Sequence, residues 1–167
     1  MKLSMKKFKF LPQYYEEIPE NLKNPESEYY LGKYILSRYP RIKDHIGKLR
    51  KKEMETLLEY MKKGVYCGGV FSERDVINGL KSIPIASLSD GKYCWAESHI
   101  YYMKNYQLDL PESFKNYVYS LNGNYEHLEV IDEELLSKEI DFFLDNPVEI
   151  TPELVKKMYD TDRYISY

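Results

Sequence analysis

Residues 89–114, which read SDGKYCWAESHIYYMKNYQLDLPESF, carry the clearest structural signals in this chain. Asp90 and Gly91 lie between two short apolar runs, and an Asp-Gly pair in this position is typical of a β-hairpin because both residues tolerate positive φ. From Ala96 onward the apolar side chains recur with the period of a helix. The positions on that face are Trp95, His99, Tyr102, Met103 and Tyr106. We therefore expect a hairpin that leads directly into a helix.

Helical patterns continue on both sides of this stretch. Pro111 begins a second pattern, and its apolar face consists of Phe114, Tyr117, Val118 and Leu121. Further helices are predicted over residues 24–40, 41–63, 72–80, 132–146 and 151–161. The helix over 72–80 would begin at Ser72 and bury Val76 and Leu80. The sequence thus predicts a mainly α, α+β fold, with residues 1–167 forming one globular domain of about six helices around a small central β-hairpin.

The composition limits the class of protein. With 167 residues, 43% hydrophobic and 31% charged, the chain has the length and composition of a globular protein with one core. No run of 18 apolar residues and no secretory signal is present, so we expect no membrane association. Cys67 and Cys94 lack a CxxC or metal-binding spacing. A cytoplasmic protein with two free thiols is the simplest interpretation, and a disulfide between them is the alternative.

Charge is distributed unevenly along the chain. Residues 1–81 contain 17 Lys and Arg against 11 Asp and Glu, whereas residues 82–167 contain 7 against 16. Such an acidic block repels nucleic acid and attracts basic protein surfaces, although a solvated helix face is an equally simple interpretation. We therefore predict no nucleic-acid partner and a protein-binding surface centred on residues 126–145. Its charged members would be Glu126, Glu129, Asp132, Glu133, Glu134, Asp141 and Asp145.

The sequence contains no recognisable catalytic or metal-binding set. His45, His99 and His127 are not spaced to share a metal, so we predict no metal and no cofactor. One enzymatic alternative is a nucleophile pair formed by Cys94 and His99, which lie five residues apart where a strand leads into a helix. No oxyanion-forming glycine motif accompanies that pair. The sequence therefore favours a protein that is not an enzyme.

The segment DGKYCW…HIYYMKNYQLDLPESF resembles a group of small bacterial proteins, several of which resemble immunity proteins of contact-dependent and related polymorphic toxin systems. The matching residues are Asp90, Gly91, Tyr93, Trp95, Tyr101, Tyr102, Tyr106, Leu110, Pro111 and Phe114. The upstream FSERDVINGL is also similar, and together these segments cover about 45 of the 167 residues. The motif has the character of a structural scaffold, in particular through Asp90, Gly91, Tyr93, Trp95, Tyr102, Pro111 and Phe114.

The resemblance implies a function in toxin neutralisation. The partner would be the C-terminal toxin domain of a larger protein, bound non-covalently, and a nuclease with a basic cleft would suit the acidic residues. A homodimer is compatible with this expectation. The alternatives are a cytoplasmic adaptor or regulatory module with several partners, and a cysteine-dependent enzyme that uses Cys94 and His99.

Overall fold

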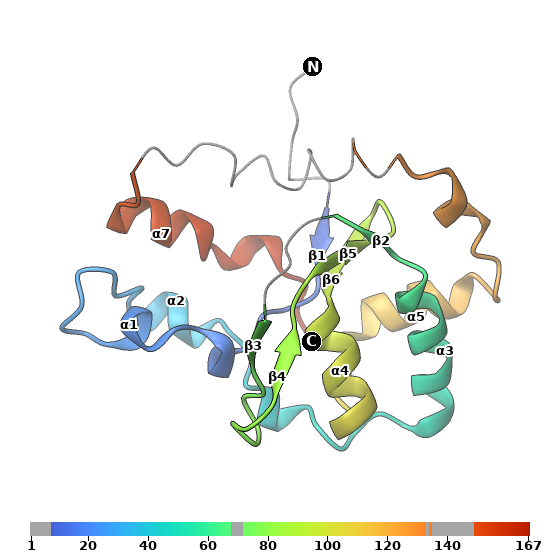
Figure 1. Ribbon diagram of the computed structural model, residues 1–167, viewed down its shortest axis with the longest axis horizontal. Coiled ribbons are helices and arrows are strands. Elements are labelled where there is room, and N and C mark those ends of the chain that lie inside the picture. The colour runs from blue at the N-terminus through green and yellow to red at the C-terminus, as the bar shows by residue number, and fades with distance from the viewer. Residues whose placement is uncertain (1–7, 68–71, 133, 135–148) are drawn as a thin grey trace.

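The computed structural model describes residues 8–67, 72–132, 134 and 149–167, and this part of the chain has an α+β fold (Figure 1). Its α-helices are α1 (Glu20–Lys23), α2 (Lys33–Ser37), α3 (Lys51–Lys62), α4 (Glu97–Tyr106), α5 (Glu112–Ser120) and α7 (Pro152–Met158). Its 3-10 helices are η2 (Tyr15–Glu17), η3 (Ile42–Asp44), η4 (Glu126–Val130) and η5 (Thr161–Arg163). Its strands are β1 (Lys9–Phe10), β2 (Val65–Tyr66), β3 (Ser72–Arg74), β4 (Ser82–Pro84), β5 (Ser87–Ser89) and β6 (Tyr93–Ala96).

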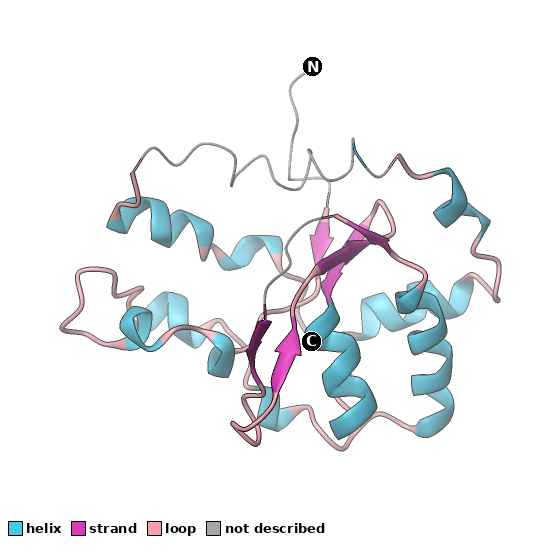
Figure 2. Cartoon of the chain, viewed as in Figure 1, coloured by secondary structure: helices cyan, strands magenta, loops and turns pink. Residues whose placement is uncertain are grey.

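The strands form two small sheets in the middle of the molecule (Figure 2). The larger sheet has the order β1-β6-β5-β2, in which β1 is parallel to β6 and the other pairs are antiparallel. The smaller sheet pairs β3 with β4. Helices α1, α2 and α7 lie on one side of these strands, and α3, α4 and α5 lie on the other (Figures 1 and 2). The sheets thus separate two helical layers.

The main hydrophobic core lies between the larger sheet and α3, α4 and α5. Its members include the buried Tyr60 and Met61 of α3, Trp95 of β6, Tyr102 of α4 and Phe114 of α5. The indole of Trp95 donates a hydrogen bond to the carbonyl oxygen of Met61 over 3.2 Å. From the predicted faces, α4 buries Tyr102 and Met103 and α5 buries Phe114 and Val118, because residues three and four apart lie on one side of a helix.

A second hydrophobic cluster joins the two ends of the described chain. It contains Ile18, Leu22, Leu31, Leu36, Tyr39 and Val155. The hydroxyl of Tyr39 donates to the carbonyl oxygen of Tyr159 over 2.6 Å. The backbone N–H of Ile165 donates to Phe10 over 2.8 Å, so the C-terminal segment pairs with β1.

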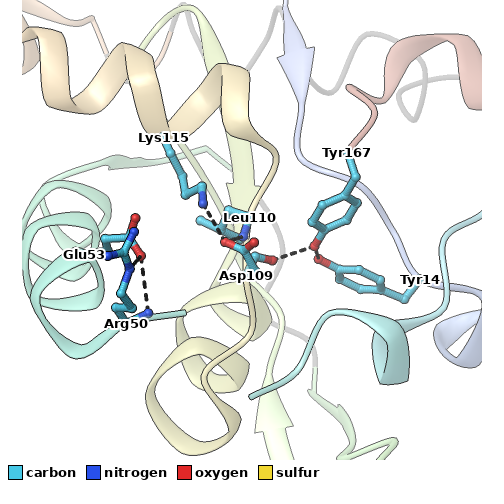
Figure 3. A network of polar contacts seen from close by, with 7 residues as sticks. All are labelled: Tyr14, Arg50, Glu53, Asp109, Leu110, Lys115 and Tyr167. Carbon is cyan, nitrogen blue, oxygen red and sulfur yellow. Dashed lines mark hydrogen bonds and ion pairs between the residues drawn. The ribbon is translucent and has the colours of Figure 1, made fainter. Parts of the chain in front are cut away.

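The C-terminal tyrosine also contacts the connection between α4 and α5 (Figure 3). Tyr167 donates from its hydroxyl to the carbonyl oxygen of Asp109 over 2.6 Å, and the hydroxyls of Tyr14 and Tyr167 lie 2.5 Å apart. Since Tyr167 uses its only proton on Asp109, Tyr14 is the donor between the two tyrosines. Lys115 forms an ion pair of 2.8 Å with the carboxylate of Asp109.

The predicted hairpin, the helix after it and the helix after Pro111 are confirmed as β5, β6, α4 and α5. The turn differs in one respect from the expectation. Gly91 has φ +90, whereas Asp90 does not have positive φ. The Asp90 carboxylate instead accepts hydrogen bonds from the backbone N–H groups of Lys92 and Tyr93, at 2.9 and 2.6 Å. The helix predicted over residues 151–161 is present but shorter, because α7 spans Pro152–Met158 with Thr151 as its cap and η5 begins at Thr161.

Three predicted helices were wrong or too long. Residues 24–40 contain only α2, because Asn24 accepts a hydrogen bond from Glu26 and caps a turn. Residues 41–63 form η3 and then α3, since the backbone N–H groups of Ile42 and Lys43 donate to the distant Glu16 carboxylate.

Residues 72–80 do not form the predicted helix. Ser72–Arg74 is a strand, β3, because it pairs with Ser82–Pro84 and leaves Leu80 90% exposed at the turn. A description as mainly α with one hairpin is therefore too narrow, because one sheet of four strands and another of two are present. The predicted helix over 132–146 lies almost entirely outside the described residues.

Candidate partner-binding surface

The acidic residues predicted to bind a partner are exposed wherever the structure describes them. Glu126 and Glu129 belong to η4 (orange in Figure 1), and Asp132 and Glu134 follow it. We call these four residues the acidic segment. The other three candidates, Glu133, Asp141 and Asp145, lie outside the described residues.

Of the three aliphatic side chains in residues 128–131, one is buried, one is half-buried and one is exposed. Leu128 is buried in the main core, and Ile131 is half-buried and packs against it. Val130, between them, is 85% exposed. Because Val130 follows Glu129 and precedes Asp132, the surface combines an exposed aliphatic group with surrounding carboxylates. Protein interfaces commonly have this composition, with an apolar centre and a polar rim.

A chain of polar contacts fixes η4 to the core. The buried hydroxyl of Tyr60 donates to Asp90 Oδ2 over 2.5 Å, and His127 Nε2 lies 3.0 Å from the same hydroxyl. Since the only proton of Tyr60 is used on Asp90, His127 is the donor to the Tyr60 oxygen. Burial, together with the Asp90 carboxylate, raises the pKa of Tyr60 and keeps its hydroxyl protonated. We call Tyr60, Asp90 and His127 the clamp.

The tip of the hairpin supports the same segment. A Cβ atom at Gly91 would lie 4.0 Å from Cδ1 of Ile131, so Ile131 approaches the turn at van der Waals distance. The ring of Tyr125 lies 5.0 Å from that of Tyr60 in an edge-to-face contact. Asp90 and Gly91, which the sequence indicated as a turn, thus also position the acidic segment. The other predicted scaffold residues, Tyr93, Trp95, Tyr102, Pro111 and Phe114, are buried.

The tyrosines of α4 hold a second turn through Asp75, which is fully buried. The hydroxyls of Tyr101 and Tyr106 each donate to Asp75 Oδ2 over 2.7 Å. The backbone N–H groups of Ile77 and Asn78 donate to Oδ1, over 2.7 and 3.0 Å. Although burial opposes ionisation, these four hydrogen bonds outweigh it and lower the pKa of Asp75. The motif tyrosines therefore form a scaffold for the β3–β4 turn.

Cys94 and His99 do not form a nucleophile pair. Cys94 is buried, its nearest hydrogen-bond partner is Ser89 Oγ at 3.5 Å, and burial raises the pKa of its thiol to about 12. His99 accepts from the backbone N–H of Ala96 at Nδ1 and donates from Nε2 to the carbonyl oxygen of Pro12. Burial lowers the pKa of His99 to about 4. A catalytic thiolate needs a lowered pKa and a base in contact, and this geometry provides neither.

Sequence reasoning missed one pair of carboxyl groups. Glu17 of η2 and Glu73 of β3 both line a cavity of about 200 Å³ with Gln13, Ser98 and Tyr164, and burial raises the pKa of each carboxyl group. The two glutamates are far apart in the sequence, and no local pattern connects them. A second cavity, of about 370 Å³, lies beside the C-terminal segment and is lined by Arg38, His45 and Tyr167, among other residues. Among the described residues, no three His, Cys, Asp or Glu side chains gather where they could hold a metal ion.

No family model, no curated protein and no solved structure matches this chain. The resemblance to immunity proteins therefore remains a prediction. Within the described parts of the chain, no helix has the length and apolar character needed to cross a bilayer.

Proposed function

We propose that this chain is an immunity-type protein that binds the toxin domain of a cognate bacterial protein and neutralises it by non-covalent occlusion in the cytoplasm. The observation that most supports this proposal is the exposure of Val130 within the acidic segment, on a backbone that the clamp fixes in place. A fixed surface loses little conformational entropy when it binds, so more of its contact energy contributes to affinity.

The charge of the acidic segment indicates the chemistry of the partner. Carboxylates at the rim would speed the association with a basic protein surface, while the aliphatic group at the centre would slow dissociation. A nuclease domain fits this description, because its cleft must attract phosphate. Glu126 and Glu129 form no ion pair with another described residue.

The first test is a pull-down of the tagged protein from lysate of its source bacterium, eluted in high salt and analysed by mass spectrometry. We expect one stoichiometric partner, namely the basic C-terminal part of a large exported protein. Co-expression with that fragment should then protect the growth of a host cell. A mixed set of weakly bound proteins would contradict immunity and favour an adaptor or regulatory module.

Mutagenesis then tests the surface. The triple variant E126K/E129K/D132K should weaken binding of the identified partner at least tenfold and reduce its salt dependence. The matched control E26K/E28K/E55K makes the same charge change at exposed positions elsewhere. Equal losses in both variants would show that net charge, and not this surface, determines binding. Unchanged affinity in the first variant would overturn the assignment of the site.

A further inference from the structure

The larger of the two cavities described above lies beside the C-terminal segment. Its volume of about 370 Å³ is within the range of about 300–1,000 Å³ that is usual for small-molecule sites. Its walls come from three parts of the chain, namely residues 12–13, 37–45 and 161–167. Arg38 and Ser166, which both line it, are exposed, so the cavity is open to the solvent.

Aromatic and aliphatic groups form much of the lining. These groups are the side chains of Pro12, Tyr39, Pro40, Tyr164, Ile165 and Tyr167. The rings of Tyr39 and Tyr164 lie 6.0 Å apart, and the ring of Tyr167 is stacked on that of His45 at 3.5 Å. Such walls suit a ligand with a flat, apolar body, because aromatic rings pack well against one another.

Hydrogen bonds fix the aromatic walls in position. Tyr167 donates from its hydroxyl to the carbonyl oxygen of Asp109 over 2.6 Å (Figure 3). The hydroxyl of Tyr164 donates to Gln13 Oε1 over 3.2 Å, and that of Tyr39 donates to a backbone carbonyl oxygen over 2.6 Å. A preformed cavity of this kind loses little conformational entropy when a ligand binds.

Arg38 supplies the charge of the cavity. No described Asp or Glu side chain is part of the lining. Burial, and then Lys48, lowers the pKa of His45, so the imidazole is neutral at physiological pH. Arg38 Nη2 forms an ion pair of 2.5 Å with the exposed Asp162, whereas its Nε and Nη1 form no hydrogen bond with a described residue. A guanidinium with N–H donors to spare is well suited to bind a carboxylate.

Two further polar groups of the lining can donate hydrogen bonds. Thr161 is 8% exposed, and its Oγ1 is buried without a partner among the described residues. Buried polar atoms of native proteins normally have a hydrogen-bond partner, so this hydroxyl is unusual. The side-chain amide nitrogen of Gln13 also forms no hydrogen bond with a described residue. Together with Arg38, these groups favour a ligand that carries acceptor oxygens.

We propose that this cavity binds a small aromatic carboxylate, whose ring packs against the tyrosine walls and whose carboxylate binds Arg38. The site does not rest on the proposed toxin partner, because none of its residues belongs to the acidic segment. Asp162 competes with the ligand for the Arg38 guanidinium. Changes at Arg38 and at Asp162 should therefore have opposite effects on affinity.

The first experiment titrates benzoate, benzamide and acetate into the full-length protein, labelled with ¹⁵N and observed by NMR. Benzoate should shift the backbone amide signals of residues 37–45 and 161–167 in a saturable manner. Benzamide has the ring without the charge, and acetate has the charge without the ring. Both should therefore bind at least about fivefold more weakly than benzoate.

The second experiment repeats the benzoate titration with variants. Arg38→Gln should weaken binding at least about fivefold, and Asp162→Asn should strengthen it about twofold to fivefold, because it removes the competing carboxylate. The matched controls R50Q and E28Q make the same two charge changes at exposed positions that do not line the cavity. Both controls should bind benzoate as the wild type does.

Three results would overturn this site. The first is a wild-type protein in which the signals of residues 37–45 and 161–167 do not respond to benzoate. The second is equal affinity for benzoate and for either benzamide or acetate, and the third is an affinity for benzoate that neither R38Q nor D162N changes. If R38Q fails to fold, the three ligands on the wild type and the D162N titration still decide between the outcomes.

Discussion

Carboxylates occupy two contrasting environments in this protein. The acidic segment consists of residues close together in the sequence, and every described member is exposed. Asp75 and Asp90 lie outside the acidic segment and are buried, and each accepts hydrogen bonds from two backbone N–H groups; Asp75 also accepts from two tyrosine hydroxyls and Asp90 from one. The first group adds negative charge to the surface, and the second holds two turns in place.

This difference shows that local charge density and structural importance are separate properties. Exposed carboxylates interact through water, where each contributes little to stability, whereas a buried carboxylate must be satisfied by fixed donors. A variant of a buried aspartate should therefore change folding, and a variant of the acidic segment should change association. The following predictions test that division, beginning with the largest expected effect on stability.

Replacing Asp75 with alanine should produce the largest loss of stability. It removes the acceptor of Tyr101, Tyr106 and two backbone N–H groups, and we expect the free energy of unfolding to fall by about 2–4 kcal/mol. Urea denaturation followed by circular dichroism would measure it. The hydrogen bond to Asp75 raises the pKa of Tyr101 to about 12, so D75A should also lower the pH at which this tyrosine ionises. A change below about 0.5 kcal/mol would contradict the structural role of this carboxylate.

Tyr60→Phe should have a smaller and more local effect. It keeps the ring in the core but removes the hydroxyl that connects Asp90 with His127, and we expect a loss of about 1 kcal/mol. Hydrogen exchange of residues 124–132 should accelerate more than that of α4. Tyr119→Phe is the control, because the Tyr119 hydroxyl has no hydrogen-bond partner among the described residues. Equal protection of residues 124–132 in both variants would show that the clamp does not hold the acidic segment.

The hairpin and the helices after it were predictable because local signals and tertiary contacts agree there. The face that contains Trp95, Tyr102 and Met103 has helical spacing, and it is the face that the core buries. Residues 24–63 were less predictable because distant residues determine their conformation. The Glu16 carboxylate accepts hydrogen bonds from the backbone N–H groups of Ile42 and Lys43, and this interaction favours a 3-10 turn over a continuous helix.

The candidate site was predictable only in part. Runs of charged residues showed where the acidic segment lies, and Asp90-Gly91 indicated a turn. That the turn supports the segment through Tyr60 and His127 could not be read from the sequence, since Tyr60 of α3 meets Asp90 of the hairpin turn and His127 of η4 only in the folded chain. Ser72 resembled the start of a helix, but Asp75 holds a turn between strands, because its carboxylate accepts from Tyr101 and Tyr106 of α4.

Asp75 and Glu73 should give opposite dependences of stability on pH, because the pKa of Asp75 is lowered and that of Glu73 is raised. The pKa of Asp75 is lowered by its hydrogen bonds, so its contribution to stability is present above its ordinary value of 3.8 and is lost as pH falls through the native value. The wild type should therefore lose more stability than D75N between pH 5 and 3. Because burial raises the pKa of Glu73, its contribution to stability is lost as pH rises. The variant E73Q should therefore lose less stability than the wild type when the pH is raised above 5. Urea midpoints measured across the full range would separate the two groups, and parallel curves for wild type and D75N would contradict the assignment to Asp75.

The smallest effect on stability is expected where the charge is densest. The triple variant E126K/E129K/D132K should change the free energy of unfolding by less than about 0.5 kcal/mol, because all three side chains are exposed. Any difference should decrease between 0.05 and 0.5 M salt, since mobile ions screen exposed charges. Thermal unfolding of the variant and the wild type at the two salt concentrations measures this difference in stability. A loss as large as that of D75A would mean that these carboxylates serve the fold, and the distinction between an exposed, partner-facing group and a buried, turn-holding group would fail at this site.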